Sequence, residues 1–214
     1  MAKEKVNLKA DEIKGHLDKL FPAPKCELEY KTPYELLVAV ILSAQCTDKR
    51  VNMVVSELFK KYNTPESMVK LSQEELEEKI HSCGFYHNKA KNILSMSRDL
   101  IEKFGGQVPA DLEEMQTLAG VGRKTANVVY SEAFAGDAIA VDTHVLRVSN
   151  RLGFVKTQDP LKCEQELMKI FPKKYWSELH LQMVHFGRYK CKALNPDCTD
   201  CPFYEICVEE KKKR

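Results

Sequence analysis

A lysine directly after a glycine-rich turn is the first residue whose surroundings suggest chemistry. Gly120 and Gly122 flank Val121, and a predicted helix begins after them with Arg123 and Lys124. A cation is disfavoured at a helix N-terminus, because the helix dipole is positive there. An amine nucleophile has to be neutral, and both burial and a helix N-terminus favour the neutral form of a lysine. The position of Lys124 therefore suits a nucleophile better than a solvated surface lysine, although an isolated helical lysine is usually the latter.

A carboxylate that could assist this amine follows in the segment AVDTHVLRV. Taken alone, Asp142 is most simply the N-cap of a helix. Taken together with Lys124, it is suited to stabilise a cationic transition state, while its negative charge partly opposes the neutral form of the amine. We expect His144 to have a structural role or to contact a phosphate, rather than to act as a base.

The glycine turn itself predicts a phosphate-binding hairpin. Without a Cβ atom at Gly120 and Gly122, backbone amides can approach a phosphate, and the N-terminus of the next helix adds positive charge. Residues 118–126, with Val121 and Thr125, resemble a helix-hairpin-helix, which holds a DNA backbone without reading its sequence. A simple turn between two helices is the alternative, which a G-x-G pattern alone would favour.

Half of the eight cysteines lie in one short segment with the pattern C-x6-C-x2-C-x5-C: Cys191, Cys198, Cys201 and Cys207. Four thiolates this close in sequence can hold zinc or a 4Fe–4S cluster. Zinc ribbons usually pair two C-x2-C knuckles, whereas this segment has one, and Pro202 follows its third cysteine. The pattern therefore favours iron–sulfur over zinc, and a disulfide framework is the least expected of the three. The other cysteines are predicted to be small buried residues: Cys26, Cys46, Cys83 and Cys163.

Bulk composition is that of an ordinary globular protein, with 214 residues, 43% hydrophobic and 30% charged. The charged N-terminus lacks the apolar segment of a secretory signal, and the longest apolar run, residues 36–42, is too short to span a bilayer. We therefore expect an intracellular protein that is neither secreted nor associated with a membrane. Because the net charge is only +2, a polyanionic partner would have to meet a local basic patch.

Helical periodicity and capping residues predict an all-α protein with roughly ten short helices and no convincing strand. The expected helix starts are at Thr32-Pro33, Asp48, Thr64-Pro65, Ser72, Asp111, Asp142 and Asp159-Pro160. Further helices are predicted over residues 87–104, from the glycine turn to about Phe134, and from Tyr175 to about Cys191. Short connections leave no obvious linker between domains.

The hairpin, the VDTH segment and the cysteine loop occur together and in this order, and the whole chain resembles the endonuclease III family. This family is the iron–sulfur branch of the helix-hairpin-helix DNA glycosylases. The resemblance implies a two-lobed all-α fold, with a six-helix barrel at residues 26–136 that includes the hairpin at about 111–134. It also implies a discontinuous iron–sulfur lobe formed by residues 1–25 and 137–214. A pocket for the damaged base would lie between the lobes.

The resemblance also implies roles for single residues. Lys124 matches the family's Schiff-base lysine and Asp142 its catalytic aspartate, while Gln45 matches the glutamine that enters the gap left by a flipped nucleotide. Phe85 stands where the family has an apolar wedge, commonly leucine. The remaining expected DNA contacts are Gly120, Val121, Gly122, Arg123, Thr125, His144, Arg188, Lys190 and Lys192.

This sequence departs from the family's pattern in several places. Ala119 stands where many members have proline, Gln116 replaces a frequent glutamate, and Cys46 replaces a frequent alanine. The segment CKALNPDC is less basic than the usual cluster loop, which weakens the expectation that this loop contacts phosphates.

The function implied is that of a bifunctional DNA glycosylase and abasic-site lyase that excises oxidised pyrimidines in base excision repair. We expect a monomer with a 4Fe–4S cluster, acting on double-stranded DNA with damaged bases or abasic sites, in the cytoplasm and nucleoid if the source is prokaryotic. A monofunctional adenine glycosylase of the same fold is one alternative, but such enzymes have serine in place of Lys124 and an added C-terminal domain. A non-catalytic DNA-binding cluster protein is another, and would need neither Lys124 nor Asp142.

Overall fold

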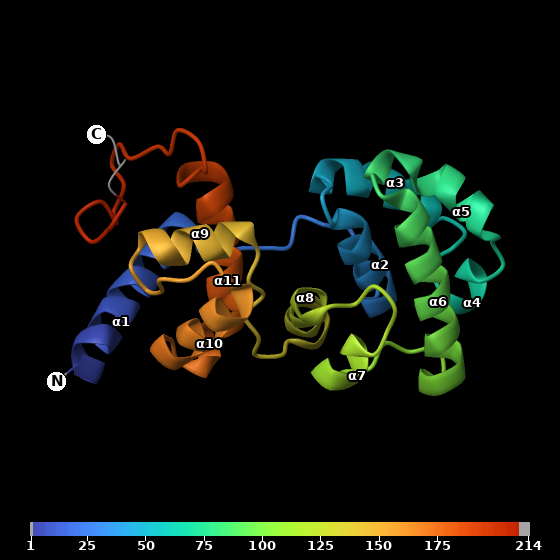
Figure 1. The fold of residues 1–214 in the computed structure, drawn as a ribbon, viewed down its shortest axis with the longest axis horizontal. Coiled ribbons are helices and arrows are strands. Elements are labelled where there is room, and N and C mark those ends of the chain that lie inside the picture. Colours follow the sequence, from blue (N-terminus) through green and yellow to red (C-terminus); the bar gives the residue numbers. More distant parts are fainter. Residues whose placement is uncertain (1, 210–214) are drawn as a thin grey trace. The chain divides into compact units, whose positions relative to one another are not determined.

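The computed structural model describes residues 2–209, and of residues 2–9 only the backbone. Within this range the chain forms helices and turns without a strand, which confirms the predicted all-α fold (Figure 1). The chain divides into two compact units, one of which is continuous, Cys26–Gly136, and one of which combines Met1–Lys25 with Asp137–Arg214. No helix among the described residues is long and apolar enough to cross a membrane.

The continuous unit is built around one largely apolar helix. Helix α2 (Pro33–Ser43) starts as predicted, since Thr32 caps it and Pro33 occupies its first turn. Its residues 36–42 are all buried, because α2 packs against α3, α6 and α8. A helix that is apolar on every side is stable only when it is surrounded in this way.

The other helices of this unit cover α2 and end in the hairpin (Figure 1). Their bounds are α3 (Asp48–Leu58), α4 (Pro65–Met68), α5 (Gln73–Ile80), the 3-10 turn η1 (His81–Cys83), α6 (Tyr86–Phe104), α7 (Leu112–Gln116) and α8 (Arg123–Phe134). Helix α3 starts at Asp48, but its cap is Thr47 and not Asp48 as predicted, because the hydroxyl of Thr47 accepts the capping hydrogen bond from the amide of Arg50.

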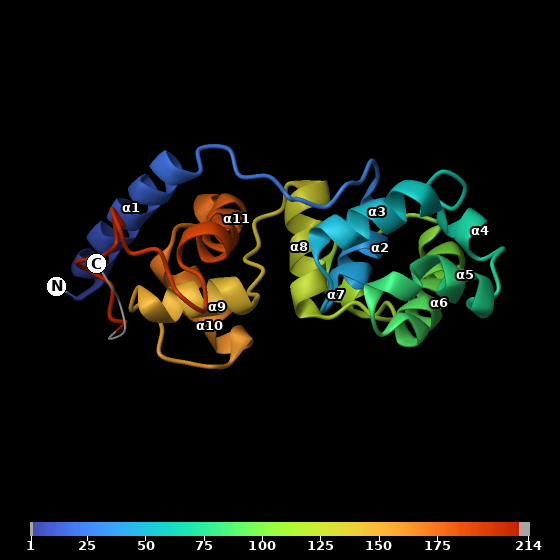
Figure 2. The ribbon, with the colours of Figure 1, turned by 90° about the horizontal axis from the view of Figure 1, so that it is seen from above.

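The second unit combines a helix from the N-terminal segment with helices from the C-terminal half (Figure 2). Its elements are α1 (Ala2–Leu20), α9 (Thr143–Arg151), α10 (Pro160–Ile170), the 3-10 turn η2 (Lys173–Tyr175), α11 (Trp176–His185) and the π-helical turn η3 (Phe186–Lys190). Helix α1 was not predicted, although the spacing of Ala10, Ile13 and Leu17 is helical. These three side chains are fully buried and α1 packs against α10 and α11.

Candidate active site

The predicted hairpin consists of α7, a glycine turn and α8. Gly120 has a φ of +78°, and a Cβ atom there would lie 2.9 Å from the Cβ of Asn92 on α6. Glycine is therefore required at this position both by backbone conformation and by space. Gly122 has an extended backbone, and a Cβ added there would meet nothing within 4 Å. The turn thus packs against α6 on one side and leaves an open approach at Gly122.

Helix α8 begins without a side-chain cap. Gly122 is its N-cap residue and supplies no side-chain hydrogen bond, whereas side-chain oxygens cap the helices α2, α3, α5 and α9. An uncapped helix start keeps its positive end and its first amides available to an anion. This arrangement suits a phosphate better than it suits an ordinary helix connection.

Lys124 is the second residue of α8, and its side chain is exposed. The expectation that Lys124 is buried is therefore not met in this structure. Thr125 is half-buried and Ala126 is fully buried, so this helix exposes Arg123 and Lys124 while its next turn packs inward.

Asp142 is the N-cap of α9, as its simplest interpretation predicts. One carboxylate oxygen, Oδ1, accepts hydrogen bonds from the amides of His144 and Val145, each at 2.8 Å. The second oxygen, Oδ2, has no part in this cap. A capping role and a catalytic role are therefore compatible for this half-buried carboxylate.

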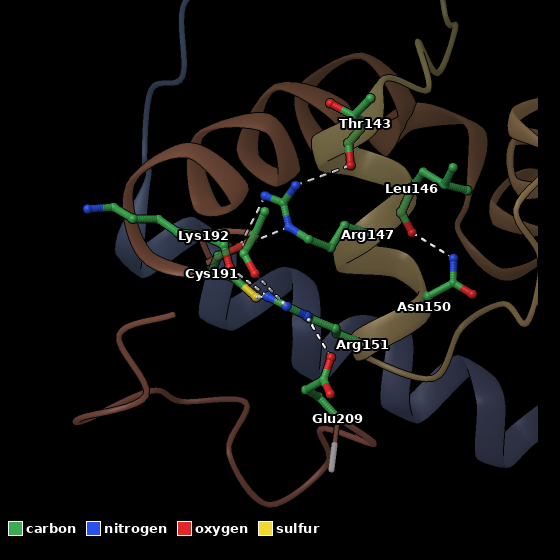
Figure 3. Close-up of polar contacts among 9 residues, drawn as sticks. Thr143, Leu146, Arg147, Asn150, Arg151, Cys191, Lys192 and Glu209 are labelled. Atoms are coloured by element: carbon green, nitrogen blue, oxygen red, sulfur yellow. Dashed lines mark hydrogen bonds and ion pairs between the residues drawn. The ribbon is translucent and has the colours of Figure 1, made fainter. Parts of the chain in front are cut away.

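Two arginines, one turn apart on α9, hold the chain at the first clustered cysteine (Figure 3). The guanidinium of Arg147 donates to the carbonyl of Cys191 at 3.1 and 3.2 Å. Arg151 donates to the Sγ atom of Cys191 at 3.4 Å, to the carbonyl of Lys192 at 2.8 Å and to the carboxylate of Glu209 at 3.0 Å. The sequence analysis missed both arginines, although their spacing of four residues places them on one face of α9.

His144 lies between the Asp142 cap and these arginines. Its Nδ1 atom is 3.2 Å from Nη2 of Arg147, which also donates to the carbonyl of Gly187 at 2.8 Å. A Cβ atom on Gly187 would approach the Cβ of His144 to 2.8 Å, so η3 passes directly over this histidine. Burial lowers the pKa of His144, and the nearby positive charges of Arg147 and Arg188 lower it further. His144 therefore packs beneath η3 as a neutral imidazole.

The four clustered cysteines line a single pocket, together with the buried side chains of Leu152, Phe186 and Phe203. The pocket has about 420 Å³ of space not filled by atoms, part of it open to solvent. Burial raises the pKa of the thiols of Cys191 and Cys201. Within residues 2–209, no three Cys, His, Asp or Glu side chains converge tightly enough to hold a single metal ion. Four thiols around one pocket are a ligand set that zinc or an iron–sulfur cluster could use.

The basic residues around the cysteine loop are not equivalent. Lys190 donates to the carboxylate of Asp197 at 3.2 Å and to the carbonyl of Thr199 at 2.9 Å, so its ammonium supports the loop from inside. Lys192 is exposed, whereas Arg188 is half-buried. Of the remaining cysteines, Cys83 and Cys163 are buried as predicted, but Cys26 and Cys46 are only half-buried.

Gln45 and Phe85, the two residues expected to enter DNA, share an unusual backbone conformation. Gln45 has a φ of 54° and Phe85 a φ of 49°, both in the left-handed region. Both side chains are exposed, and that of Phe85 is 64% exposed. Such exposure shows that the side chain of Phe85 is not part of the buried core of its unit. Non-glycine residues in this conformation cluster at functional sites.

The fold and the hairpin define the class to which the chain belongs. Residues 38–173 match the family described as the HhH-GPD superfamily of base excision DNA repair proteins. The chain is 51% identical to endonuclease III of Bacillus subtilis, over 97% of this chain and 96% of that protein. It is 47% identical to endonuclease III of Synechocystis, over 93% of this chain and 91% of that protein.

A solved structure agrees with these relatives. A trapped covalent intermediate of an endonuclease III with DNA matches with a TM-score of 0.90 and 51% identity, over 97% of this chain and 96% of that one. The chain belongs to the endonuclease III family. It is accordingly a DNA glycosylase and abasic-site lyase of base excision repair, in a family that generally contains an iron–sulfur cluster.

Proposed function

We propose that this enzyme excises oxidised pyrimidines from duplex DNA and then cleaves the strand, with Lys124 as the nucleophile. The observation that carries the proposal is the position of Lys124, which is exposed in the first turn of a helix that begins at an uncapped glycine turn. A phosphate held at that helix start brings the neighbouring deoxyribose within reach of the amine. Support comes from the relative solved as a trapped covalent intermediate with DNA.

The first chemical step replaces the base by the enzyme. The neutral amine of Lys124 attacks C1′ of the flipped nucleotide, and the base leaves with the electron pair of its glycosidic bond and takes up a proton. Asp142 stabilises the positive charge that develops on the sugar. The proposal requires both side chains to reach the same deoxyribose, with Oδ1 of Asp142 still engaged in capping α9.

The second step cuts the strand. The sugar ring opens to an imine between Lys124 and C1′, with the ring oxygen taking up a proton. Loss of a proton from C2′ then expels the 3′ phosphate with the electron pair of the C3′–O bond. Hydrolysis of the imine by water frees Lys124. These steps need no oxidant or reductant.

DNA is held mainly through its backbone in this proposal. Gly120, Val121, Gly122, Arg123 and Thr125 form the phosphate site of the hairpin, and Lys192 and Arg188 are further proposed contacts with the DNA backbone. Gln45 and Phe85 enter the duplex at the flipped nucleotide. We further propose that the continuous unit is the six-helix barrel domain, that the second unit is the cluster domain, and that the enzyme acts inside the cell as a monomer.

Cys191, Cys198, Cys201 and Cys207 would hold a 4Fe–4S cluster. The support is the set of four thiols around one pocket with apolar walls. When bound, the cluster supplies a cross-link that orders the loop, and the excision chemistry belongs to the side chains of the chain itself. Protein purified without air should contain roughly four irons per chain and absorb visible light. Stoichiometric zinc would contradict the assignment.

One experiment separates this function from its two rivals. Duplexes with a single oxidised pyrimidine, a single adenine opposite oxidised guanine, or a preformed abasic site are incubated with the enzyme, with and without borohydride. We expect excision and strand cleavage for the oxidised pyrimidine, and a trapped adduct with the abasic duplex. Excision of adenine without cleavage would indicate the monofunctional enzyme, and binding without either reaction a non-catalytic protein.

A further inference from the structure

Lys89, near the start of α6, is a buried lysine that the reaction does not use. Its side chain is 5% exposed. Its Nζ atom donates three hydrogen bonds, to the carbonyls of Leu42 at 2.9 Å, Ala44 at 2.8 Å and Cys83 at 2.5 Å. An ammonium group has three N–H donors, so the charged form of Lys89 is fully satisfied by backbone oxygens.

The three carbonyls belong to two separate segments. Leu42 lies in the last turn of α2, and Ala44, the C-cap of α2, directly precedes Gln45. Cys83 ends η1, two residues before Phe85. The amide of Lys89 also donates to the carbonyl of Phe85 at 3.2 Å. A single side chain therefore connects the segment that presents Gln45 to the segment that presents Phe85.

Both segments need such support because of their backbone conformation. Gln45 and Phe85 are non-glycine residues with positive φ, and Gly84 between Cys83 and Phe85 also has a φ of +59°. Conformations of this kind persist only where the surrounding structure fixes them. Both side chains are exposed, whereas the carbonyls of Ala44 and Cys83, next to or near them in the chain, are fixed by Lys89.

A lysine that only capped α2 would not need the hydrogen bond to Cys83. Lysine often binds the last carbonyls of a helix, and Leu42 and Ala44 alone would satisfy that role for α2. The third and shortest bond reaches Cys83, on the other loop. Burial lowers the pKa of Lys89, while the thiols of Cys83 and Cys46 oppose this effect.

We propose that Lys89 is the positioning residue that holds the Gln45 and Phe85 loops in one fixed relation, so that both side chains enter the DNA together when a nucleotide is flipped. The inference rests on the proposed function, which assigns the DNA-inserting roles to Gln45 and Phe85. It predicts that Lys89 affects base extrusion and leaves the subsequent lyase chemistry unchanged.

The test compares Lys89→Met with Lys103→Met in the full-length enzyme. Both variants lose one positive charge from α6, but Lys103 is exposed near the far end of that helix, where it pairs with Asp99. Single-turnover rates are measured for excision of thymine glycol from a duplex and for cleavage of a preformed abasic site. For Lys89→Met we expect excision to slow about 10- to 100-fold and abasic cleavage to change less than about threefold. Lys103→Met should resemble the wild type on both substrates.

A fluorescence signal isolates the extrusion step. In a Lys124→Gln background, 2-aminopurine opposite the thymine glycol should brighten when the enzyme opens the stack. Lys89→Met should reduce this signal, as should Phe85→Ala and Gln45→Ala, whereas Lys103→Met should not. Lys89→Gln, which retains two donors, should recover part of both the signal and the excision rate.

Each other result overturns the inference in a distinguishable way. If Phe85→Ala and Gln45→Ala extrude and excise normally, the proposed roles of these loops fail and the inference fails with them. If those variants are impaired but Lys89→Met matches Lys103→Met, the inference alone fails. Equal losses on both substrates, or failure of both Lys89→Met and Lys89→Gln to fold, would assign Lys89 to stability instead.

Discussion

Asp142 illustrates how one side chain serves two purposes at the residue scale. Its Oδ1 atom caps α9 through two amides, which is a structural function that asparagine can also perform because its side-chain oxygen accepts the same bonds. Asparagine lacks the negative charge that the proposed sugar cation requires. The two functions of Asp142 can therefore be separated by substitution.

We expect Asp142→Asn to keep the thermal midpoint of the enzyme and to reduce base excision more than cleavage at a preformed abasic site. Asp142→Ala should in addition lower the free energy of unfolding by about 1 kcal/mol, because the cap is lost. Thermal denaturation and single-turnover assays of both variants measure these effects. Equal stability losses in both variants would show that the carboxylate is held by something other than the cap.

His144 predicts a pH dependence of stability. Burial, with Arg147 and Arg188 nearby, holds its pKa below the usual 6.5, and the charge of Asp142 and the carbonyl of Gly187 only partly oppose this. The unfolded chain therefore binds a proton near pH 6.5 that the folded chain does not. Stability should be constant above pH 6.5 with respect to this group and fall as the pH decreases below it.

The measurement is the urea midpoint of the wild type and of His144→Gln between pH 5 and pH 7.5, a range set about the ordinary histidine pKa. We expect the wild type to lose more stability than the variant as the pH falls. A wild-type curve that runs parallel to that of His144→Gln would show that the imidazole gains its proton equally in both states.

At the scale of elements, α9 connects the proposed chemistry to the cysteine loop. Its first turn is capped by Asp142, and its later turns present Arg147 and Arg151 to the carbonyl and thiol of Cys191 (Figure 3). The amide of Val208 also donates to the carbonyl of Arg151 at 2.8 Å, so the chain near the last cysteine returns to the same helix. Helix α9 thus contacts both ends of the cysteine loop.

Arg151→Met should loosen this loop. The variant removes charged hydrogen bonds to Cys191, Lys192 and Glu209, and we expect the free energy of unfolding to decrease by about 1–3 kcal/mol. Arg98→Met, at an exposed position on α6, is the matched control and should be near neutral. Urea denaturation followed by far-UV circular dichroism compares them. Equal stability of the two variants would contradict the role of Arg151.

Local signals predicted most of the helices and missed what depends on distant contacts. Pro33 and the Ser72–Glu75 capping box mark helix starts by themselves, and Gly105 marks the end of α6. Helix α1 was missed because its charged sequence hides a narrow apolar face, which is buried only against α10 and α11.

The same distinction holds for the candidate site: residues with a local sequence signal were predicted, and residues that act through distant contacts were not. The spacing of the glycines and of the clustered cysteines indicates a phosphate site and a metal site. Nothing in the sequence around Lys89 indicates that its ammonium binds carbonyls of two separate segments. Lys89 bonds Leu42, 47 residues away in the sequence, and Arg151 bonds Lys192, 41 residues away. The expected burial of Lys124 was wrong, because the first turn of α8 is exposed and only its next turn packs inward.

At the scale of the whole molecule, the cysteine loop lies in the unit that is assembled from two separate chain segments. Phe203, between the third and fourth cysteines, is fully buried and packs edge-on against His16 of α1 and Phe186 of η3, with ring centroids 5.5 and 5.0 Å apart. The loop therefore contributes directly to the core that joins the N-terminal helix to the C-terminal half.

Cys198→Ser should consequently destabilise the second unit and weaken DNA binding, while the continuous unit, which contains the hairpin, stays folded. Limited proteolysis should release fragments from residues 137–209 before any from residues 26–136, and iron content should fall. Cys163→Ser, in the buried core of the same unit but outside the loop, should retain its iron. Iron retained by Cys198→Ser would remove that thiol from the ligand set.

The identity of the amine that bonds to DNA is the central claim, and one measurement tests it directly. The enzyme is reacted with a duplex carrying an abasic site, reduced with borohydride and digested, and the modified peptide is sequenced by mass spectrometry. We expect one deoxyribose-derived adduct, on Lys124, which is absent from Lys124→Gln and present in Lys103→Gln. An adduct on any other amine, or one that persists undiminished in Lys124→Gln, would contradict this claim.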